Sequence, residues 1–395
     1  MRILAYCDED LGVAAGGSRQ VLEFTKALAS RGHDVCVVAP QSERTTPGIS
    51  MTPRVQMHFV PVMRWGGFRP LSFLMNSKQT LTKLLHEQCP DVVLWFDSPG
   101  QIAPLWAIRE TSCPVVYFVN GLPNDEVRGI WRIPPLLALL GYGLHLAVNS
   151  AAVIVSVCPE LLCSLRSRES VDSSKLVVIR NGVDPTHFSP LPQEVARHEL
   201  GLPKQGPYIG FVGGFFPWHG LDTLVDAIGI VAKSYPTVCC LLVGDGVMKP
   251  TLEAQVRRLQ LSRSIHFVGR ADFSEVPRWI AAFDICVVLH RQTRSYPGDS
   301  MKLWEYLACG RPVVATAGPG YGDTVSDLGC GLSARADDPS DLARQIIALL
   351  DNAELRENMG QRGRSAAVRA HTWSVRAAQL EQVCQQAIEQ TALAA

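Results

Sequence analysis

Short apolar strands alternate with amphipathic helices along this chain, and they do so in two successive series. The first series begins with the strand-like segment Arg2–Tyr6, and the glycine pair Gly16-Gly17 opens the helix that follows. The second begins with Tyr208–Val212, which the glycine pair Gly213-Gly214 follows. Strands that are separated by helices pair in parallel and are covered by helices on both faces. The pattern therefore predicts an α/β fold with two Rossmann-like, doubly wound domains.

Each series is long enough to form a domain with its own core. In the first domain we expect strands at Arg2–Tyr6, Val35–Ala39, Val92–Phe96, Val115–Val119, Val153–Val157 and Lys175–Ile179. In the second we expect strands at Tyr208–Val212, Cys239–Val243, Ile265–Val268, Ile285–Leu289 and Val313–Ala315. The prolines and glycines between residues 190 and 207 are typical of a linker. The sequence therefore predicts domains at residues 1–190 and 203–372.

The composition excludes several classes of protein. Apolar residues make up 47% of the 395 residues and charged residues 19%, which is typical of a globular chain. The formal net charge is zero and no basic stripe is present, so we expect no nucleic-acid partner. The twelve cysteines show no CxxC pairing, and the amino-terminal residues turn acidic at once. We therefore expect reduced thiols, no signal peptide and a cytoplasmic location.

One stretch, Tyr296–Thr316, carries the strongest chemical signal in the chain. It is typical of a loop, a short helix and a buried strand, with Asp299 or Ser300 as the helix N-cap and Gly310 as the stop. The N–H groups at the start of this helix lie at its positive end, which binds phosphate groups readily. Glu305 lies roughly 5–6 Å deeper along the helix axis, a separation that suits a ribose next to a diphosphate. From these residues alone, a buried helix with solvated charged side chains is an equally good interpretation.

Two segments of the first domain raise the question of a membrane. Residues Ile133–Pro159 contain no Asp, Glu, Lys or Arg, but prolines, glycines and polar residues interrupt them. We expect a helix to about Asn149 that packs inside the fold, in preference to a membrane-spanning helix. Basic and aromatic residues interleave between Met63 and Leu85, namely Arg64, Trp65, Phe68, Arg69, Phe73, Lys78 and Lys83. That segment is either an ordinary surface or, together with the charge-free run, a peripheral contact on the inner membrane face.

Five motifs together resemble the GT-B glycosyltransferases, in particular the retaining family-4 (glycosyl transferases group 1) type. They are Gly16-Gly17, NGVDPTHFSP (Asn181–Pro190), GFVGGFFPWHGLDTLVDAI (Gly210–Ile228), HFVGR (His266–Arg270) and SMKLWEYLACGRPVVAT (Ser300–Thr316). Their order and spacing cover nearly the whole chain. The resemblance implies two domains that face each other across a cleft, with the last helix, residues 373–395, packing back on the first domain.

The resemblance also implies roles for individual residues. Glu305 matches the second glutamate of the family's E-x7-E motif, which binds the donor ribose. The N–H groups of Ser300–Leu303 would hold the donor diphosphate, and Arg270 would line the base pocket. The donor-binding residues expected are Gly16, Gly17, Gly213, Gly214, Arg270, Ser300, Met301, Lys302, Leu303 and Glu305.

The chain departs from the family pattern on the sugar side and on the acceptor side. Pro297 stands where the first glutamate of E-x7-E is expected, which leaves the donor sugar to the backbone or to Asp299. Asn120 stands where the family usually has a histidine at the end of a first-domain strand. We take both departures as variation within an enzyme family.

A third departure concerns the charge of the diphosphate. Gly214 and His219 stand where the family has an Arg and a Lys that bind it. The positive charge then falls to His219 and Lys302, with Arg291 or Arg294 as further candidates. The catalytic residues expected are Asn120, His219 and Lys302.

The resemblance implies a glycosyltransferase that moves a sugar from a nucleotide-diphosphate sugar to an acceptor hydroxyl or amine, with retention. We expect no metal and no obligatory cofactor, because helix N–H groups and Lys302 can meet the charge of the diphosphate and because we identify no Asp-x-Asp motif. The acceptor stays open between a sugar, a lipid-linked molecule and another small molecule. Two alternatives also stay open: a nucleotide-sugar 2-epimerase with the same fold, and a degenerate GT-B protein that binds a nucleotide sugar or scaffolds partners.

Overall fold

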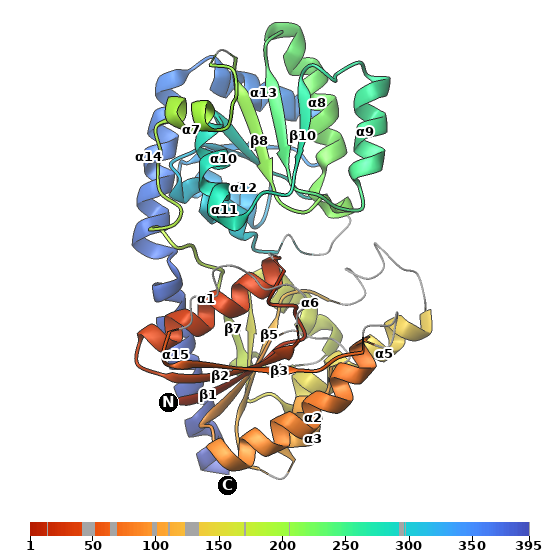
Figure 1. Cartoon of the computed structure of the whole chain (residues 1–395), viewed down its shortest axis with the longest axis vertical. Coiled ribbons are helices and arrows are strands. Elements are labelled where there is room, and N and C mark those ends of the chain that lie inside the picture. The colour runs from red at the N-terminus through yellow and green to blue at the C-terminus, as the bar shows by residue number, and fades with distance from the viewer. Residues whose placement is uncertain are drawn as a thin grey trace. The chain divides into compact units, whose positions relative to one another are not determined.

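The chain forms two compact α/β units. The structure, a computed structural model, describes residues 1–13, 15–41, 52–63, 69–96, 101–109, 111–122, 134–169, 171–204, 206–291, 296 and 298–394. Met1–Asn181 and Trp373–Ala395 form the first unit, and Gly182–Thr372 form the second (Figure 1). Each unit contains one parallel sheet with helices packed against it, so the predicted α/β fold with two doubly wound sheets is confirmed.

The first unit holds a seven-stranded parallel sheet in the order β3-β2-β1-β4-β5-β6-β7. Its strands are β1 (Arg2–Tyr6), β2 (Asp34–Pro40), β3 (Val55–Val60), β4 (Val92–Phe96), β5 (Val115–Val119), β6 (Val153–Ser156) and β7 (Leu176–Val178). Its helices are α1 (Gly16–Ser30), α2 (Arg69–Gln88), α3 (Ala103–Ile108), α5 (Pro134–Ser150), α6 (Pro159–Glu169) and α15 (Trp373–Ala394). The central strands β4, β5 and β6 are buried along their whole length, as expected for parallel strands covered on both faces.

The second unit holds a six-stranded parallel sheet in the order β10-β9-β8-β11-β12-β13. Its strands are β8 (Tyr208–Val212), β9 (Cys239–Val243), β10 (Ile265–Gly269), β11 (Ile285–Val288), β12 (Val313–Thr316) and β13 (Gly331–Ala334). Its main helices are α7 (Gln193–Glu199), α8 (Leu221–Ser234), α9 (Lys249–Arg258), α10 (Val276–Ala282), α11 (Met301–Ala308), α12 (Tyr321–Asp327), α13 (Pro339–Leu350) and α14 (Ala353–Ala370). Alternate strand residues enter two separate cores, one against α8, α9 and α13 and the other against α10 and α11.

Helix α15 belongs to the first unit although it follows the second in sequence (Figure 1). It packs against α1, where the rings of Phe24 and Trp373 meet edge to face with centroids 5.1 Å apart. Further along, the Glu381 carboxylate accepts from the Arg31 guanidinium, with Nε at 2.7 Å, and lies 3.2 Å from His33 Nε2. Apolar and charged contacts therefore hold this helix in place.

The structure contains elements that the sequence did not predict. Strand β3 is a half-exposed edge strand, and β13 (GLSA) lacks the β-branched run that marks a buried strand. Helix α14 carries Gly360, a poor helix former that is needed here, because a Cβ at this residue would lie 2.2 Å from the carbonyl oxygen of Gly310. Tertiary contacts therefore decide these segments against their local propensity.

The predicted linker at residues 190–207 is corrected by the structure. This segment belongs to the second unit, and the chain passes between the units at Asn181–Gly182 and Thr372–Trp373. The buried Arg197 of α7 anchors it, because the guanidinium binds the Asp284 carboxylate at 2.7 Å and the Ala282 carbonyl at 3.0 Å. Proline and glycine content alone did not reveal these contacts.

The strand order of each sheet reverses at one point. The reversal lies between β1 and β4 in the first sheet and between β8 and β11 in the second. In open parallel sheets, ligands bind beyond the carboxyl ends of the strands at such a reversal. The loops that follow β1, β8 and β11 are therefore the places to look for a functional site.

Candidate functional site

Four predicted residues meet at the strand reversal of the second sheet. Gly213 and Gly214 follow β8, His219 ends a short turn just before α8, and Lys302 lies in the first turn of α11, beyond β11. Lys302 Nζ lies 3.5 Å from His219 Nε2 and 5.2 Å from the centre of the Phe211 ring. A Cβ on Gly213 would lie 3.0 Å from Lys302 Cε, and Gly213 has a φ of +140°, so glycine suits this position twice over.

The His219 ring has a defined tautomer. Its Nδ1 lies 2.6 Å from the carbonyl oxygen of Gly214. Because a carbonyl oxygen only accepts hydrogen bonds, Nδ1 carries the proton, and in the neutral ring Nε2 is the acceptor that faces Lys302. The ring therefore directs the Lys302 ammonium, which is the cation of this pair.

Helix α11 begins as the sequence predicts. Ser300 is the N-cap, with extended backbone angles and no capping bond from its side chain. The Leu303 N–H donates to the Ser300 carbonyl at 3.1 Å, and the Leu303 side chain is buried in the core. Asp299 is buried and accepts from the Trp304 indole at 3.4 Å. Its carboxylate thus has a structural contact close to the start of the helix.

The other predicted residues of the second unit lie on α11 and after β10. Glu305 is half-buried on α11, and its negative charge adds to the burial that raises the pKa of the Cys309 thiol to about 12. Arg270 is exposed and follows β10, the outermost strand of the sheet. Like Gly213 after β8, it lies at the carboxyl end of its strand. Met301 is half-buried in the first turn of α11.

Of the two further candidate cations, Arg291 lies next to this cluster, since its N–H donates to the Trp218 carbonyl oxygen at 3.0 Å, but its guanidinium is engaged elsewhere. Arg291 binds two carboxylates, Asp222 through Nη2 at 2.5 Å and Asp337 through Nε at 3.1 Å. These ion pairs direct its guanidinium toward α8 and the loop after β13. Arg294 lies outside the described residues, as does Pro297. Arg64, Trp65 and Phe68 of the basic and aromatic segment and Ile133 of the charge-free run also lie outside them.

In the first unit, Asn120 follows strand β5 and is half-buried. Its amide pairs with that of Gln20 on α1, since Asn120 Nδ2 donates to Gln20 Oε1 at 2.7 Å and Gln20 Nε2 donates to Asn120 Oδ1 at 3.1 Å. Gln20 was not among the predicted site residues. Its one signal was a polar side chain on the buried face of an amphipathic helix, a pattern that is common in cores.

The glycine pair that opens α1 contacts an acidic loop. A Cβ on Gly17 would lie 2.1 Å from Glu9 Oε1, so the Glu9 carboxylate fills the space beside this glycine, while Gly16 is exposed. A carboxylate is favourable at the positive end of a helix. Asp8, Glu9 and Asp10 form an Asp-x-Asp run after β1, so the expectation that the chain has no Asp-x-Asp motif is wrong. The Asp10 carboxylate accepts from the Gly12 N–H at 3.0 Å.

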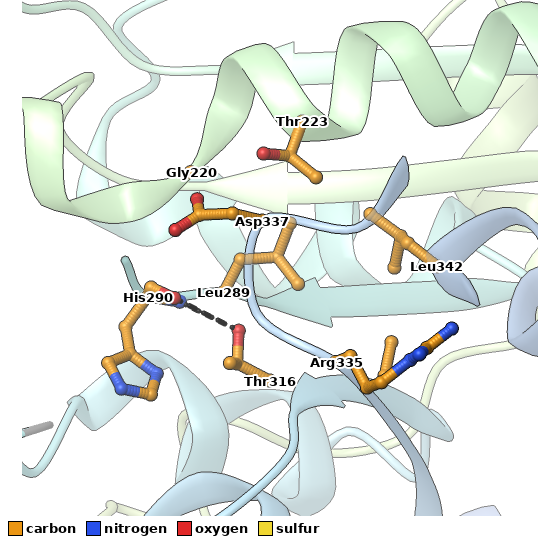
Figure 2. A pocket seen from close by; sticks show the side chains of 9 residues that line it. Gly220, Thr223, Leu289, His290, Thr316, Arg335, Asp337 and Leu342 are labelled. Carbon is orange, nitrogen blue, oxygen red and sulfur yellow. Dashed lines mark hydrogen bonds between the residues drawn. The ribbon is translucent and has the colours of Figure 1, made fainter. Parts of the chain in front are cut away.

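A small hollow lies at the carboxyl ends of β11, β12 and β13, and it is open to solvent (Figure 2). It encloses ≈ 230 Å³ including the space at its mouth, and it is lined by Gly220, Thr223, Leu289, His290, Thr316, Ala334, Arg335, Asp337 and Leu342. The His290 N–H donates to Thr316 Oγ1 at 2.9 Å across its floor. None of the predicted donor-binding residues lines it, so the hollow is distinct from the Lys302 cluster.

Several general properties bear on the predictions. All twelve cysteines are free thiols, and eight of them are buried. Among the described residues, no three His, Cys, Asp or Glu side chains form a group that could hold a metal ion.

Over the same parts of the chain, no helix is long and apolar enough to cross a membrane. The charge-free run forms α5 and β6, as predicted, but the amino-terminal half of α5 is largely exposed rather than packed inside the fold.

Comparison with known proteins agrees with the geometry. Residues 14–187 match the family described as Glycosyltransferase Family 4, and residues 192–366 match the family described as Glycosyl transferases group 1. Over 319 residues the chain is 36% identical to an uncharacterized glycosyltransferase of Methanocaldococcus jannaschii, covering 78% of this chain and 79% of that protein. Over 401 residues it is 30% identical to D-inositol 3-phosphate glycosyltransferase 2 of Catenulispora acidiphila, covering 96% and 91%.

A solved structure has the same fold. The Anabaena protein HepE, in complex with UDP and glucose, matches with a TM-score of 0.77 at 18% identity, covering 98% of this chain and 99% of that one. At this identity the likeness concerns the fold, and the two curated relatives show the family. The chain therefore belongs to the GT-B glycosyltransferases of the group 1 and family 4 type.

Proposed function

We propose that this glycosyltransferase moves a sugar from a nucleotide-diphosphate sugar to an acceptor hydroxyl or amine, with retention at the anomeric carbon and without a metal. One observation carries the proposal. Lys302, directed by His219 and placed against Gly213, lies in the first turn of α11 at the strand reversal of the second sheet. A cation and a helix start meet there at the position where open parallel sheets bind ligands.

The donor diphosphate is the group that this arrangement suits. When the bond between the anomeric carbon and the diphosphate breaks, negative charge grows on the departing phosphate oxygen. The Lys302 ammonium and the positive end of α11 stabilise that charge where it develops. His219 holds the ammonium in place, so little reorganisation is needed during the reaction.

We place the ribose of the donor beside α11 and its base beside the loop after β10. Glu305, one turn further along α11 than Lys302, accepts hydrogen bonds from the ribose hydroxyls. Arg270, exposed after β10, lies beside the base. The likeness to HepE, which is described with UDP and glucose, supports a nucleotide donor of this kind.

The acceptor belongs to the first unit, where Asn120 follows β5. An amide can hold a hydroxyl group of an acceptor but cannot act as a base. D-Inositol 3-phosphate glycosyltransferase 2 is named for a small polyol phosphate, which supports a hydroxyl acceptor as a class. A lipid-linked acceptor is the form that we favour, because α5 carries no charged residue and exposes Leu139 and Tyr142.

A donor panel tests the function. The protein is incubated with nucleotide sugars of different base and sugar, together with a cell extract, and products are identified by mass spectrometry. We expect a new glycoconjugate with one donor, the same anomeric configuration by NMR, and equal rates with EDTA and with added magnesium or manganese. A product that forms from the donor alone identifies a 2-epimerase, and donor binding without any product identifies a binding protein. Loss of transfer in EDTA would overturn the metal-free part, and the Asp-x-Asp run after β1 would then be the first place to look.

A further inference from the structure

The side-chain amide of Gln20 makes three hydrogen bonds to other side-chain amides. The residue lies on α1 and is 3% exposed. Its Nε2 donates to Asn120 Oδ1 at 3.1 Å and to Asn181 Oδ1 at 2.8 Å, and its Oε1 accepts from Asn120 Nδ2 at 2.7 Å. Both N–H donors of the amide are therefore used. In this arrangement the Gln20 nitrogen faces two amide oxygens.

The three amides of this network differ in their access to solvent. Gln20 and Asn181 are buried, at 3% and 5% exposed, whereas Asn120 is half-buried. Asn120 is therefore the member that a substrate can reach. A half-buried asparagine at the end of a strand has several rotamers available, and a paired amide behind it selects one of them.

The network also joins the two places where the chain leaves and re-enters the first unit. Asn181 is the last residue before the chain passes to the second unit. Its carbonyl oxygen accepts from Arg376 Nε at 3.3 Å, and the buried Arg376 lies in the first turn of α15, just after the chain returns. Gln20 thus connects Asn120 to Asn181, and Arg376 of α15 binds the Asn181 carbonyl.

We propose that Gln20 is a positioning residue for sugar transfer: its buried amide fixes the orientation of Asn120 on the acceptor side and ties it to Asn181. This rests on the proposed function, which places Asn120 beside the acceptor. Gln20 itself does not touch the substrate. It acts through Asn120, so its loss slows transfer without weakening the binding of the donor nucleotide, which the second unit holds.

The test is a double-mutant cycle with Gln20→Met and Asn120→Ala. Methionine keeps the length and most of the shape of glutamine but makes none of its three hydrogen bonds. We expect Gln20→Met to lower kcat about tenfold, with unchanged nucleotide affinity by calorimetry. Asn120→Ala should also impair transfer. The double variant should be no slower than Asn120→Ala alone, because Gln20 has nothing left to position. Losses that multiply, or a normal kcat in Gln20→Met, would overturn the proposal.

A second readout does not depend on activity. Amide hydrogen exchange of the folded variant should rise around residues 118–122 and 179–183, and Thr25→Val serves as the control. Thr25 is also buried on α1, but its hydroxyl donates to the Val21 and Leu22 carbonyls of its own helix. This control should keep wild-type exchange and transfer. If exchange rises in Gln20→Met but the wild type transfers no sugar, Gln20 ties Asn120 to Asn181 as proposed, and the proposed function is wrong. If exchange is unchanged and the wild type is active, the proposed function stands and the role of Gln20 is wrong.

Discussion

The close approach of the Lys302 side chain favours glycine at position 213. The Lys302 side chain crosses the backbone of Gly213 so closely that a Cβ there would meet its Cε at 3.0 Å. His219 then fixes the end of the side chain at 3.5 Å from its own Nε2. The Arg and Lys that the family resemblance leads us to expect in this loop are absent, and Lys302 of α11 lies against the loop. We propose that this lysine meets the charge of the diphosphate in their place.

The first prediction at this scale concerns the Lys302–His219 pair. Lys302→Ala should lower kcat more than it raises the donor KM, because the leaving-group charge grows only in the transition state. His219→Gln should lower kcat less, since it leaves the ammonium present but undirected.

Steady-state kinetics of the wild type, Lys302→Ala and His219→Gln measure both effects. Phe211→Leu is a useful companion variant, because it removes the ring under Lys302 and keeps the hydrogen bond to His219. A normal kcat in both Lys302→Ala and His219→Gln would remove these residues from the mechanism.

The second prediction concerns Glu305. Replacing its carboxylate by the amide in Glu305→Gln should weaken hydrogen bonds to the ribose hydroxyls, each worth about 1.5–3 kcal/mol for a charged acceptor. The affinity for the donor nucleotide should fall at least about tenfold, as measured by calorimetry. Circular dichroism should show an intact fold, because Glu305 is half-buried at the surface of α11 and not in its core. Unchanged nucleotide affinity would count against the ribose role.

At the scale of single elements, α5 is unusual. It carries no charged residue, and only Gly143, Leu144, Ala147 and Val148 of its carboxyl-terminal half are buried. Leu139 and Tyr142 are 63% and 61% exposed. A helix of this kind keeps one end in the fold and offers the other to an apolar phase. The exposed Leu139 and Tyr142 support the proposed contact with a lipid surface.

The corresponding prediction is tested by liposome flotation. Wild type should float with anionic vesicles at low salt and less at high salt, where screening weakens the attraction of Arg69, Lys78 and Lys83 on α2. A Leu139→Glu/Tyr142→Glu variant should stay at the bottom, because each buried apolar side chain contributes about 1.5 kcal/mol or more to the contact. Val247→Glu is the control, since Val247 is 59% exposed in the second unit. Wild type that stays at the bottom at low salt would end the idea.

At the scale of the whole molecule, the first unit depends on a helix that comes last in the chain. Glu381 of α15 is held mainly by its hydrogen bond with Arg31, and that bond lowers the pKa of the carboxyl group below its usual value. The folded state therefore favours the ionised form. Its contribution is complete above about pH 4.3, the ordinary value for a glutamate, and is lost as the pH falls through the lowered pKa.

The prediction is that Glu381→Gln loosens α15 at neutral pH. A partly exposed ion pair of this kind contributes about 1 kcal/mol, which corresponds to roughly fivefold faster amide exchange along α15 at pH 7. The ratio of variant to wild-type exchange at the same pH should approach one as the pH falls through the lowered pKa of the wild-type carboxyl group. Glu389→Gln, on the exposed side of the same helix, is the matched control. A ratio that stays constant with pH would contradict the role of the charge.

The sequence was informative wherever the physics is local. Apolar runs and helical spacing located the strands of both sheets except β3 and β13. Helix propensity located α11 with Asp299 or Ser300 as its N-cap, and the structure has Ser300. The same reasoning missed α14, whose Gly360 and Gly363 are unfavourable locally and are required by the approach of the Gly310 backbone and of the Leu307 side chain. It also treated the α7 segment as a linker, since the ion pair between Arg197 and Asp284 joins residues that are distant in sequence.

What the sequence determined by itself is the α/β class, the two series of strands and the element that carries Lys302 and Glu305, because propensity and periodicity act over a few neighbouring residues. What only the tertiary structure decided is which side chains meet. Lys302 and His219 are 83 residues apart, Gln20 and Asn120 are 100 apart, and Gln20 and Asn181 are 161 apart. Such contacts exist only once the sheets have formed and brought the carboxyl ends of their strands to one edge.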